Sequence, residues 1–392
     1  MSSLTRLRTA LALERNVLTL SGTVFLLVTS LFTWYLLLPL YFRDLGASDA
    51  QVGLAYSLLT ASFSLLQFAG GLLADRFGRK GPIVLPTFVF VPLYFLAGAA
   101  RSWLLLLIPL LLINSLSAIQ YPAFMALIAE SVPEGQRGMA FGAFEFAIGL
   151  ATALGPGLGA ALLPLVGLRP LIYGTALITL VCALARVVGL RETSHQPTSL
   201  DVGELRHHFD ARLRWFLAAA SLFALVYTLT LWGPFTALHA EDALHLSKPQ
   251  INGLFALGGF AAMAASLLGG RFTDRYGGRQ ALLVGCLSHV ITMLAWALSR
   301  GLWVGGALFV MANMGLQVGI VAYSTLLTRM APDRARGVVV GVSGTVVGVT
   351  SGVAPAVGAY LRGAFGSAAP FWAALGLGVA MALSLRPIAG DS

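Results

Sequence analysis

The residues of this sequence best able to form a polar site lie in one short charged turn. Its charged residues and glycines are Gly71, Asp75, Arg76, Gly78, Arg79 and Lys80. A second turn, with Asp274 and Arg275 at the same spacing, follows 199 residues later. Opposite charges four residues apart can be neighbours, so Asp75 and Arg79 are expected to pair.

Glu130 is expected on the same side as this turn, because it ends a later apolar run. The pattern therefore predicts a three-residue cluster of Asp75, Arg79 and Glu130. The second copy differs, since Gly278 and Arg329 stand where the first copy has Arg79 and Glu130. Asp274 is still able to meet Arg329, but the three-residue cluster cannot form there. The alternative is that these charges serve only to fix the orientation of the chain.

Glu145 is the one carboxylate expected well inside an apolar run, about 10 Å from its end at 1.5 Å per residue. Intramembrane carboxylates are costly and usually functional. Gly142 and Gly149 share its helix face, so we expect Glu145 to point away from lipid. Burial raises the pKa of a carboxyl group, so Glu145 is a candidate proton carrier. A structural hydrogen bond or a water-filled crevice is the alternative.

Three other patterns carry weaker hypotheses. His289 lies in an apolar run and is more often a packed residue than a proton relay. A loose metal-ligand pattern, for which a solvated loop is the ordinary interpretation, is formed by His239, Glu241, Asp242 and His245. The segment Gly341 to Gly344, with Ser343, matches a hydrolase nucleophile pattern, but a repeat explains Gly341. We therefore expect no metal site and no enzyme.

Composition and run length identify the elements that must position these residues. The 392 residues are 57% hydrophobic and only 10% charged, whereas soluble domains carry about 25% charged residues. A membrane-spanning helix needs roughly 20 apolar residues. Twelve runs qualify: 17–42, 50–73, 82–100, 103–128, 138–164, 168–188, 214–238, 249–271, 280–299, 302–327, 337–361 and 366–386. The sequence predicts an all-α membrane protein.

The basic residues sort strongly between the two sides of the membrane. Nineteen Lys and Arg fall on the side of the termini, including Arg186 beside the central loop, and six fall on the other side. By the positive-inside rule, both termini and the central loop are expected in the cytoplasm. We expect a multi-pass protein of a bacterial inner membrane, and the net charge of +9 is not a sign of nucleic-acid binding.

The second half of the sequence repeats the first at one constant offset of 199 residues. The matching positions include Ser48 with Ser247, Gln51 with Gln250, Asn114 with Asn313, Pro133 with Pro332, Arg137 with Arg336, Pro156 with Pro355 and Gly159 with Gly358. This register predicts two six-helix bundles, residues 1–188 and 214–392, joined by a cytoplasmic linker over 189–213. Two homologous bundles are typical of transporters.

The first turn resembles the signature loop of the major facilitator superfamily. The resemblance extends to the twelve apolar runs, which match the spans of that superfamily. A second pattern resembles the antiporter motif of its twelve-span drug/proton antiporters, and consists of Gly142, Gly155, Pro156 and Gly159. That subgroup usually has an arginine in the fourth span, where this chain offers Asn114. The resemblance implies that Asp75 also lies against the start of the eleventh span and that the cluster closes the cytoplasmic side.

In this superfamily the first, fourth, seventh and tenth spans line the substrate cavity. The candidate lining residues here are Trp34, Tyr35, Asn114, Gln120, Tyr121, Tyr227, Trp232, Asn313, Gln317 and Tyr323. They are aromatic or neutral, which suits lipophilic or amphipathic substrates better than anions that need arginine pairs. About half of them are expected only to pack helices.

These features favour a secondary transporter that exports hydrophobic compounds in exchange for protons. A symporter, a uniporter or a lipid flippase of the same fold is the alternative, and an intramembrane serine hydrolase is a remote one. The sequence has no GxxxxGK[ST] loop for nucleotide. We expect no cofactor, a proton gradient as energy source, and a monomer whose partners are the bilayer, protons and a lipophilic small molecule.

Overall fold

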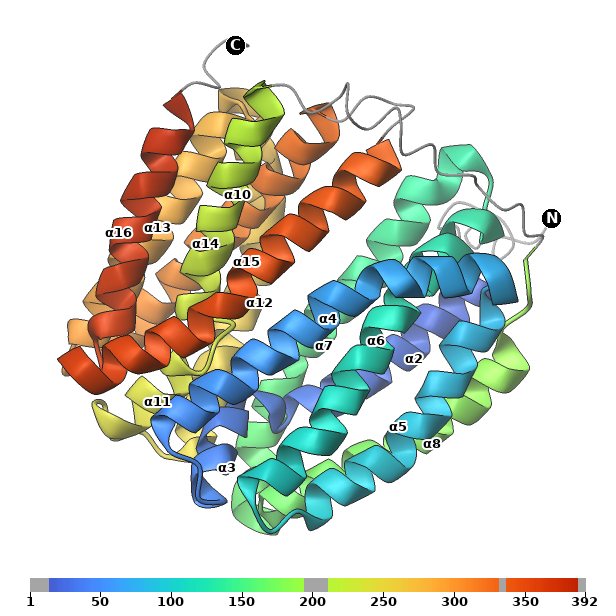
Figure 1. Cartoon of the computed structure of the whole chain (residues 1–392), viewed down its shortest axis with the longest axis horizontal. Coiled ribbons are helices and arrows are strands. Elements are labelled where there is room, and N and C mark those ends of the chain that lie inside the picture. The colour runs from blue at the N-terminus through green and yellow to red at the C-terminus, as the bar shows by residue number, and fades with distance from the viewer. Residues whose placement is uncertain (1–13, 194–210, 331–335, 387–392) are drawn as a thin grey trace. The chain divides into compact units, whose positions relative to one another are not determined.

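The computed structural model describes residues 14–193, 211–330 and 336–386 and consists there of helices without strands (Figure 1). The first half contains α2 (Arg15–Phe32), η1 (Tyr35–Leu37), α3 (Leu38–Asp44), α4 (Asp49–Phe77), α5 (Lys80–Ala99), α6 (Trp103–Ser131), η2 (Glu134–Gln136), α7 (Arg137–Val166) and α8 (Leu168–Gly189). The second contains α10 (Ala211–Leu229), α11 (Phe235–Asp242), α12 (Lys248–Tyr276), α13 (Gly278–Leu298), α14 (Leu302–Met330), α15 (Arg336–Phe365) and α16 (Ala369–Ser384).

These helices account for all twelve expected spans. Within the described residues, nine segments are long and apolar enough to cross a membrane, and α4 is a tenth that bends between Gln67 and Ala69. Two shorter apolar helices, α10 and α16, complete the set. Most of the expected linker lies outside the described residues.

The first span of each half is interrupted, which the sequence did not predict. After α2 the chain makes the short turn η1 before α3, and α10 ends at Leu229 before α11 begins at Phe235. Pro39 lies in the first turn of α3, and Pro234 is the N-cap of α11. Proline has no N–H to continue a preceding helix but fits the first turn of a new one.

The helices after these interruptions begin with the same cap in both halves. At α4, the Ser48 N–H donates to Gln51 Oε1 at 2.8 Å, and the Gln51 N–H donates to Ser48 Oγ at 3.3 Å. Ser247 and Gln250 form the same reciprocal box at α12. A capping box satisfies two N–H groups that have no partner inside the helix. The repeat thus extends to local hydrogen bonding.

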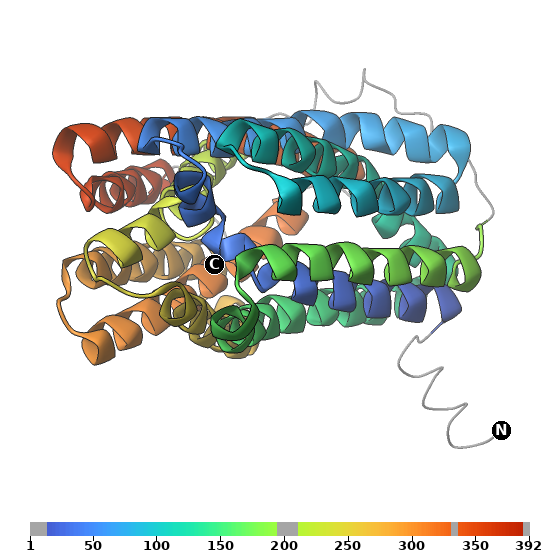
Figure 2. The ribbon, with the colours of Figure 1, turned by 90° about the horizontal axis from the view of Figure 1, so that it is seen from below.

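The described chain forms two compact units. The first comprises residues 1–36 and 62–198, and the second comprises 37–61 and 199–392. In the first, α2 packs against α7 and α8, and α5 packs against α6 and α8 (Figure 2). Its core lies beneath the charged turn, and includes Leu20, Ile83, Phe124, Leu127 and Phe144.

In the second unit α14 packs on α12 and α13, and α10 packs on α15 and α16. The start of α4 belongs here and lies close to α15. A Cβ added to Gly53 would come within 2.6 Å of the Pro355 carbonyl oxygen, and the Ala356 N–H donates to Ser57 Oγ at 3.0 Å. Residues 37–61 therefore pack with the second unit. The predicted bundle boundaries, which keep them in the first bundle, remain a prediction.

Candidate gating and substrate sites

The predicted cluster in the first charged turn forms, and we call Asp75, Arg79 and Glu130 the signature-turn cluster. Arg79 Nη1 donates to Asp75 Oδ1 at 2.7 Å, and its Nη2 donates to Glu130 Oε1 at 2.9 Å. The Arg79 side chain is only 6% exposed. Burial alone lowers the pKa of this guanidinium, but the two carboxylates outweigh burial and raise the pKa above its ordinary value. Its charge is therefore permanent.

Glu192, just after α8, adds a contact that the sequence did not predict. Its carboxylate accepts the backbone N–H groups of Arg79 at 2.7 Å and of Lys80 at 3.1 Å, at the start of α5. An anion is favourable at a helix N-terminus, where N–H groups lack partners. Thr193 also donates to Glu130. The beginning of the linker is thereby fastened to the turn, and an acid directly after a span was the only signal for it.

The second copy of the turn is weaker, as predicted. Arg329 lies 4.0 Å from Asp274, and their side chains are 61% and 78% exposed. Exposed pairs of this kind contribute little stability. Arg76 and Arg275, which occupy equivalent positions in the two turns, lie over the aromatic rings that follow them. The side chains at the start of α15, through residue 341, are not described, so the expected contact of the eleventh span with Asp75 stays a prediction.

Glu145 lies on α7, and its expected role in a buried setting stays a prediction. Its side chain is exposed on α7, and within the described residues it forms no hydrogen bond or ion pair. Tyr121 on α6 is near enough to interact with it electrostatically. A Cβ added to Gly142 or Gly149 would meet nothing within 4 Å. Among the described residues, the glycine face around Glu145 therefore has no close neighbour at these two positions.

The second part of the antiporter pattern, from Gly155 to Gly159, is packed against a neighbouring helix. A Cβ at Gly155 would come within 2.7 Å of the Thr29 carbonyl oxygen of α2, and both Pro156 and Gly159 are buried. α7 continues as one helix through Pro156. The small residues at this end therefore allow α2 and α7 to approach closely.

The candidate lining residues divide into two groups. Trp34, Gln120 and Asn313 are buried: Trp34 Nε1 donates to Thr175, Gln120 donates to the Ile83 carbonyl and to Thr87, and Asn313 donates to the Phe309 carbonyl. These three pack helices and are corrected to structural residues. The others are half-buried or exposed, namely Tyr35, Asn114, Tyr121, Tyr227, Trp232, Gln317 and Tyr323. Only this second group is open enough to contact a substrate.

Two of the candidate histidines, His289 and His239, have structural partners. His289 is buried, with Nδ1 2.8 Å from the Ala312 carbonyl oxygen and Nε2 2.8 Å from Thr230 Oγ1. His239 is buried against Trp296, with Nε2 2.9 Å from the Ala297 carbonyl oxygen. No group of metal ligands occurs in the described ranges. The interpretation of the segment from His239 to His245 as a solvated loop was wrong, because Asp242 is held in ion pairs.

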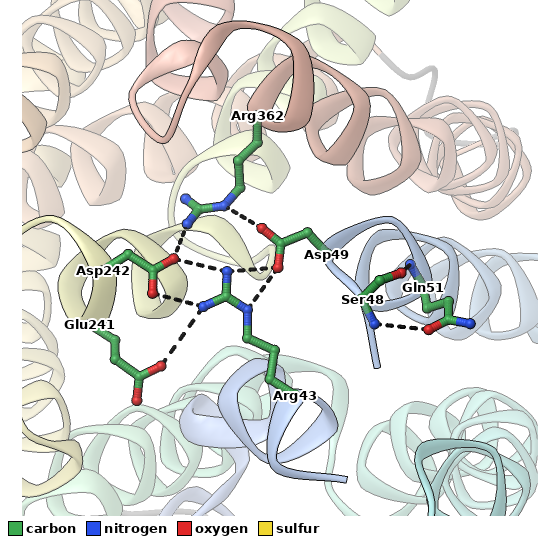
Figure 3. Close-up of polar contacts among 7 residues, drawn as sticks. All are labelled: Arg43, Ser48, Asp49, Gln51, Glu241, Asp242 and Arg362. Atoms are coloured by element: carbon green, nitrogen blue, oxygen red, sulfur yellow. Dashed lines mark hydrogen bonds and ion pairs between the residues drawn. The ribbon is translucent and has the colours of Figure 1, made fainter. Parts of the chain in front are cut away.

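Those ion pairs form a site that the sequence did not predict, shown in Figure 3. We call Arg43, Asp49, Asp242 and Arg362 the four-residue network; they come from α3, α4, α11 and α15. Arg43 donates to both oxygens of Asp242 at 2.8 Å and lies 2.6 Å from Asp49. Arg362 donates to Asp49 at 2.9 Å and also to Asp242. Each arginine therefore contacts both aspartates.

Arg43 and Asp242 occupy equivalent positions in the two repeats, 199 residues apart. Burial alone raises the pKa of the Asp242 carboxyl, but Arg43 and Arg362 outweigh burial and lower that pKa below its ordinary value. Burial raises the pKa of Glu241, whose carboxylate lies 3.8 Å from Arg43 at the edge of the network. The constant repeat offset was the available signal in the sequence. The comparison at that offset considered only identical residues, so it missed the opposite charges of Arg43 and Asp242.

Arg186 is a second unpredicted feature, because the sequence placed it among the cytoplasmic charges. It is 1% exposed, inside the first unit. Its Nε donates to Thr23 Oγ1 at 3.0 Å, its Nη1 donates to Thr87 Oγ1 at 2.7 Å, and it lies 5.1 Å from the centre of the Phe124 ring. Hydroxyl groups and an aromatic face thus contact this guanidinium, and these contacts join α2, α5, α6 and α8.

A sequence profile of the Major Facilitator Superfamily matches residues 20–355 and, again, 236–389. The chain belongs to the major facilitator superfamily. It is therefore a transporter and not an enzyme, and its all-α, twelve-helix fold is that of the superfamily.

Several superfamily members resemble this chain over most of their length. The multi-drug resistance efflux pump PmrA of Streptococcus pneumoniae is 25% identical over 86% of each chain. The multidrug resistance protein MdtG of Citrobacter koseri is 28% identical over 87% of this chain and 86% of that protein. The quinolone resistance protein NorA of Staphylococcus aureus is 21% identical over 94% of this chain and 95% of that protein.

Solved structures of the superfamily share the fold. A bacterial homologue of the human lysosomal transporter Spinster, in an inward-facing unoccupied conformation, gives a TM-score of 0.74 at 18% identity, over 95% of this chain and 92% of that one. The human organic anion transporter MFSD10 gives 0.66 at 18% identity, over 95% and 99%. At these identities the likeness extends to the fold alone.

Proposed function

We propose that this superfamily member exports lipophilic or amphipathic compounds by alternating access, in exchange for protons. The observation that carries the proposal is the similarity to three kinds of drug-resistance protein over 86% to 94% of this chain. The similarity includes both halves of the chain. It therefore extends over the whole transport unit and is not limited to one shared segment.

The residues open to a substrate support this substrate class. Tyr35, Tyr121, Tyr227, Gln317 and Tyr323 supply aromatic faces and neutral hydrogen-bonding groups. Such surfaces suit a bulky apolar ligand that needs few directed polar contacts. A dedicated anion site would instead need exposed arginines on these helices, and the arginine inside the first unit, Arg186, is already bound to hydroxyl groups.

Glu145 remains the proposed proton carrier, although for a changed reason. An exposed, unpaired carboxylate near Tyr121 is free to exchange a proton when water reaches it. It is also free to meet a cationic substrate directly. Proton release and substrate binding at one carboxylate would couple their opposite movements.

Proton release from the purified protein tests this function. Adding a fluorescent lipophilic cation to weakly buffered, detergent-solubilised protein should release protons from the parent, and reconstituted protein should concentrate the dye only under a pH gradient. Transport without proton release would favour a uniporter or flippase, and proton uptake with substrate would favour a symporter. We also propose a monomer in a bacterial inner membrane with both termini in the cytoplasm.

A further inference from the structure

We propose that Arg15 and Lys80 bind the phosphate group of an anionic phospholipid at the end of α8, on the membrane side expected to be cytoplasmic. We call these two residues the α8 cation pair. Their side chains belong neither to the signature-turn cluster nor to the four-residue network. The proposal is therefore independent of what the protein transports and of how transport is energised.

The α8 cation pair is held by the last carbonyl groups of one helix. Lys80 Nζ, from the start of α5, donates to the Val187 carbonyl at 2.8 Å. Arg15, from the start of α2, donates from Nη2 to the Val188 carbonyl at 2.5 Å and from Nε to the Gly189 carbonyl at 2.9 Å. These three carbonyls are consecutive in one helical turn, so the two cationic groups lie within about 10 Å of each other. One lipid headgroup can reach both.

These contacts leave much of the positive charge unbalanced. The C-terminus of a helix offers roughly half a negative charge, against the two full positive charges here. Glu192 is nearby, but its carboxylate accepts backbone N–H groups at the start of α5, and within the described residues neither Arg15 nor Lys80 forms an ion pair. Arg15 uses two of the five N–H donors of a guanidinium, and Lys80 uses one of the three of an ammonium. Arg15 is exposed and Lys80 is half-buried, so the remaining donors are open to a phosphate group.

α8 carries an apolar stripe that leads along the membrane to this pair. Leu177, Val181, Leu184 and Val188 are each more than half exposed, and their spacing places them on one helix face. The stripe covers roughly 16 Å of helix at 1.5 Å per residue, which is about half of the 30 Å hydrocarbon layer. It therefore fits the acyl chains of one leaflet, and the α8 cation pair lies at the level of the headgroups of that leaflet.

A lipid at this position would touch all three helices that meet there. α8 packs on α2 and on α5, and its contact with α2 is close, because a Cβ added to Gly189 would come within 2.6 Å of Thr19 Oγ1. Arg15 belongs to α2 and Lys80 to α5, so one phosphate bound to both would hold these two helices on α8. A water-soluble anion supplies the same charge but not the acyl chains that cover the apolar stripe. The expected ligand is therefore a lipid and not free phosphate.

Lipid binding to the purified full chain tests the proposal. In native mass spectrometry of detergent-solubilised protein, phosphatidylglycerol should bind more tightly than phosphatidylcholine, which has the same glycerol backbone and chains but no net charge. Arg15→Gln and Lys80→Gln should each weaken the binding of phosphatidylglycerol about fivefold, which corresponds to ~1 kcal/mol for one cation near anionic lipid. Binding of phosphatidylcholine should not change. Arg15→Lys, which keeps the charge, should retain most of the preference.

Arg137→Gln is the matched control, because Arg137 also donates to a helix-end carbonyl, that of Ala129, but has a carboxylate partner in Glu134 at 4.0 Å. This variant should bind both lipids as the parent does. Equal affinity of the parent for the two lipids would overturn the proposal, and so would losses in Arg15→Gln and Lys80→Gln no larger than the loss in the control. Inorganic phosphate that displaces phosphatidylglycerol at constant ionic strength would indicate a site for a soluble anion and would overturn the choice of a lipid.

Photochemical crosslinking leaves both cations in place and covers the case in which a variant does not fold. Val188→benzoylphenylalanine, reconstituted in vesicles with equal amounts of the two lipids, should form adducts with phosphatidylglycerol in excess. Val304, an exposed residue of α14 expected near the other membrane face, is the control position and should show no such excess. The same ratio of adducts at both positions would overturn the proposal, whether or not the protein transports drugs.

Discussion

Arg79 and Arg362 show one principle at the scale of single residues, since each is nearly buried and held by two carboxylates. A buried guanidinium with two partners stays paired when one of them is removed. The loss of one carboxylate therefore weakens a contact without leaving a lone charge. Single substitutions at these sites are expected to shift conformational populations more than they reduce folding.

Asp75→Asn should weaken closure of the predicted cytoplasmic side, because Arg79 loses its 2.7 Å bond to Asp75 and keeps Glu130. A loss on the order of 1 kcal/mol would change the ratio of closed to open forms about fivefold. Spin-label distances across that side should lengthen. Asp274→Asn is the control, because its 4.0 Å contact is exposed. Equal spin-label distances in the Asp75→Asn and Asp274→Asn variants would contradict a role in closure and would mean that Asp75 only sets the topology.

Glu145→Gln should abolish transport driven by a pH gradient while preserving folding, since the side chain has no structural partner within the described residues. The amide resembles the protonated carboxyl and cannot release a proton. Dye accumulation in proteoliposomes is the measurement. Glu134→Gln, at a side chain that is almost fully exposed, is the control. Proton-coupled accumulation equal to the parent's would contradict a role for Glu145.

The pKa of Asp242 predicts how the four-residue network responds to pH. That pKa is lowered by Arg43 and Arg362 in the folded protein. The contribution of Asp242 is therefore complete above about pH 4 and is lost only as pH falls through the lowered value. Spin labels at Leu54 and Tyr360, both exposed, should keep one distance from pH 8 to pH 5. A transition within that range would contradict this assignment.

At the scale of elements, α4 joins both charged sites. Asp49 at its start belongs to the four-residue network, and Asp75 near its end belongs to the signature-turn cluster. Asp75 lies 26 positions after Asp49, which corresponds to roughly 39 Å of helix at 1.5 Å per residue. The two ends belong to different units, and the helix bends between Gln67 and Ala69. α4 is therefore the element through which the two sites are connected in the chain.

Gly53→Ala should loosen the start of α4 from α15. The added Cβ would come within 2.6 Å of the Pro355 carbonyl oxygen, a backbone atom that cannot turn aside. Overpacking of this kind costs about 1–3 kcal/mol, so the melting temperature should fall and a Ser57→Cys reporter should react faster with a maleimide. Gly71→Ala, in the same helix but with open space around it, should change neither. Similar melting temperatures for both variants would show that the contact yields without cost.

At the scale of the whole molecule, the two repeats share their helices and differ in their charges. Both halves have an interrupted first span and a capped second span. Only the first, however, has a buried arginine in its charged turn. This difference is expected if the two halves hold the same fold while their contacts serve different steps of one cycle.

The topology is tested by two cysteines. An impermeant maleimide added to intact cells should label Ser102→Cys, between the third and fourth spans, and should not label Ser199→Cys, which lies outside the described residues. The buried native cysteines keep the background low. The opposite pattern would reverse the orientation inferred from the nineteen and six basic residues.

The sequence by itself determined the fold and one of the charged sites. Twelve apolar runs fix twelve helices, because unpaired backbone groups are not tolerated in lipid. The signature-turn cluster was also predictable, since Asp75 and Arg79 are four residues apart and Glu130 ends a span on the same side. The spacing of Asp75 and Arg79 is a local property, and the place of Glu130 follows from the membrane side on which its span ends. Both can be read from the sequence.

Only the tertiary structure decided which distant groups meet. It showed that Arg43 pairs with Asp242 and Arg362 with Asp49, that Arg186 donates to two threonines, and that the Glu145 side chain is exposed on α7. Hydropathy specifies that a residue is in a helix but not its neighbours on other helices. In a chain that is 57% hydrophobic, that choice depends on how helix faces pack, and packing is set by shape rather than by pattern.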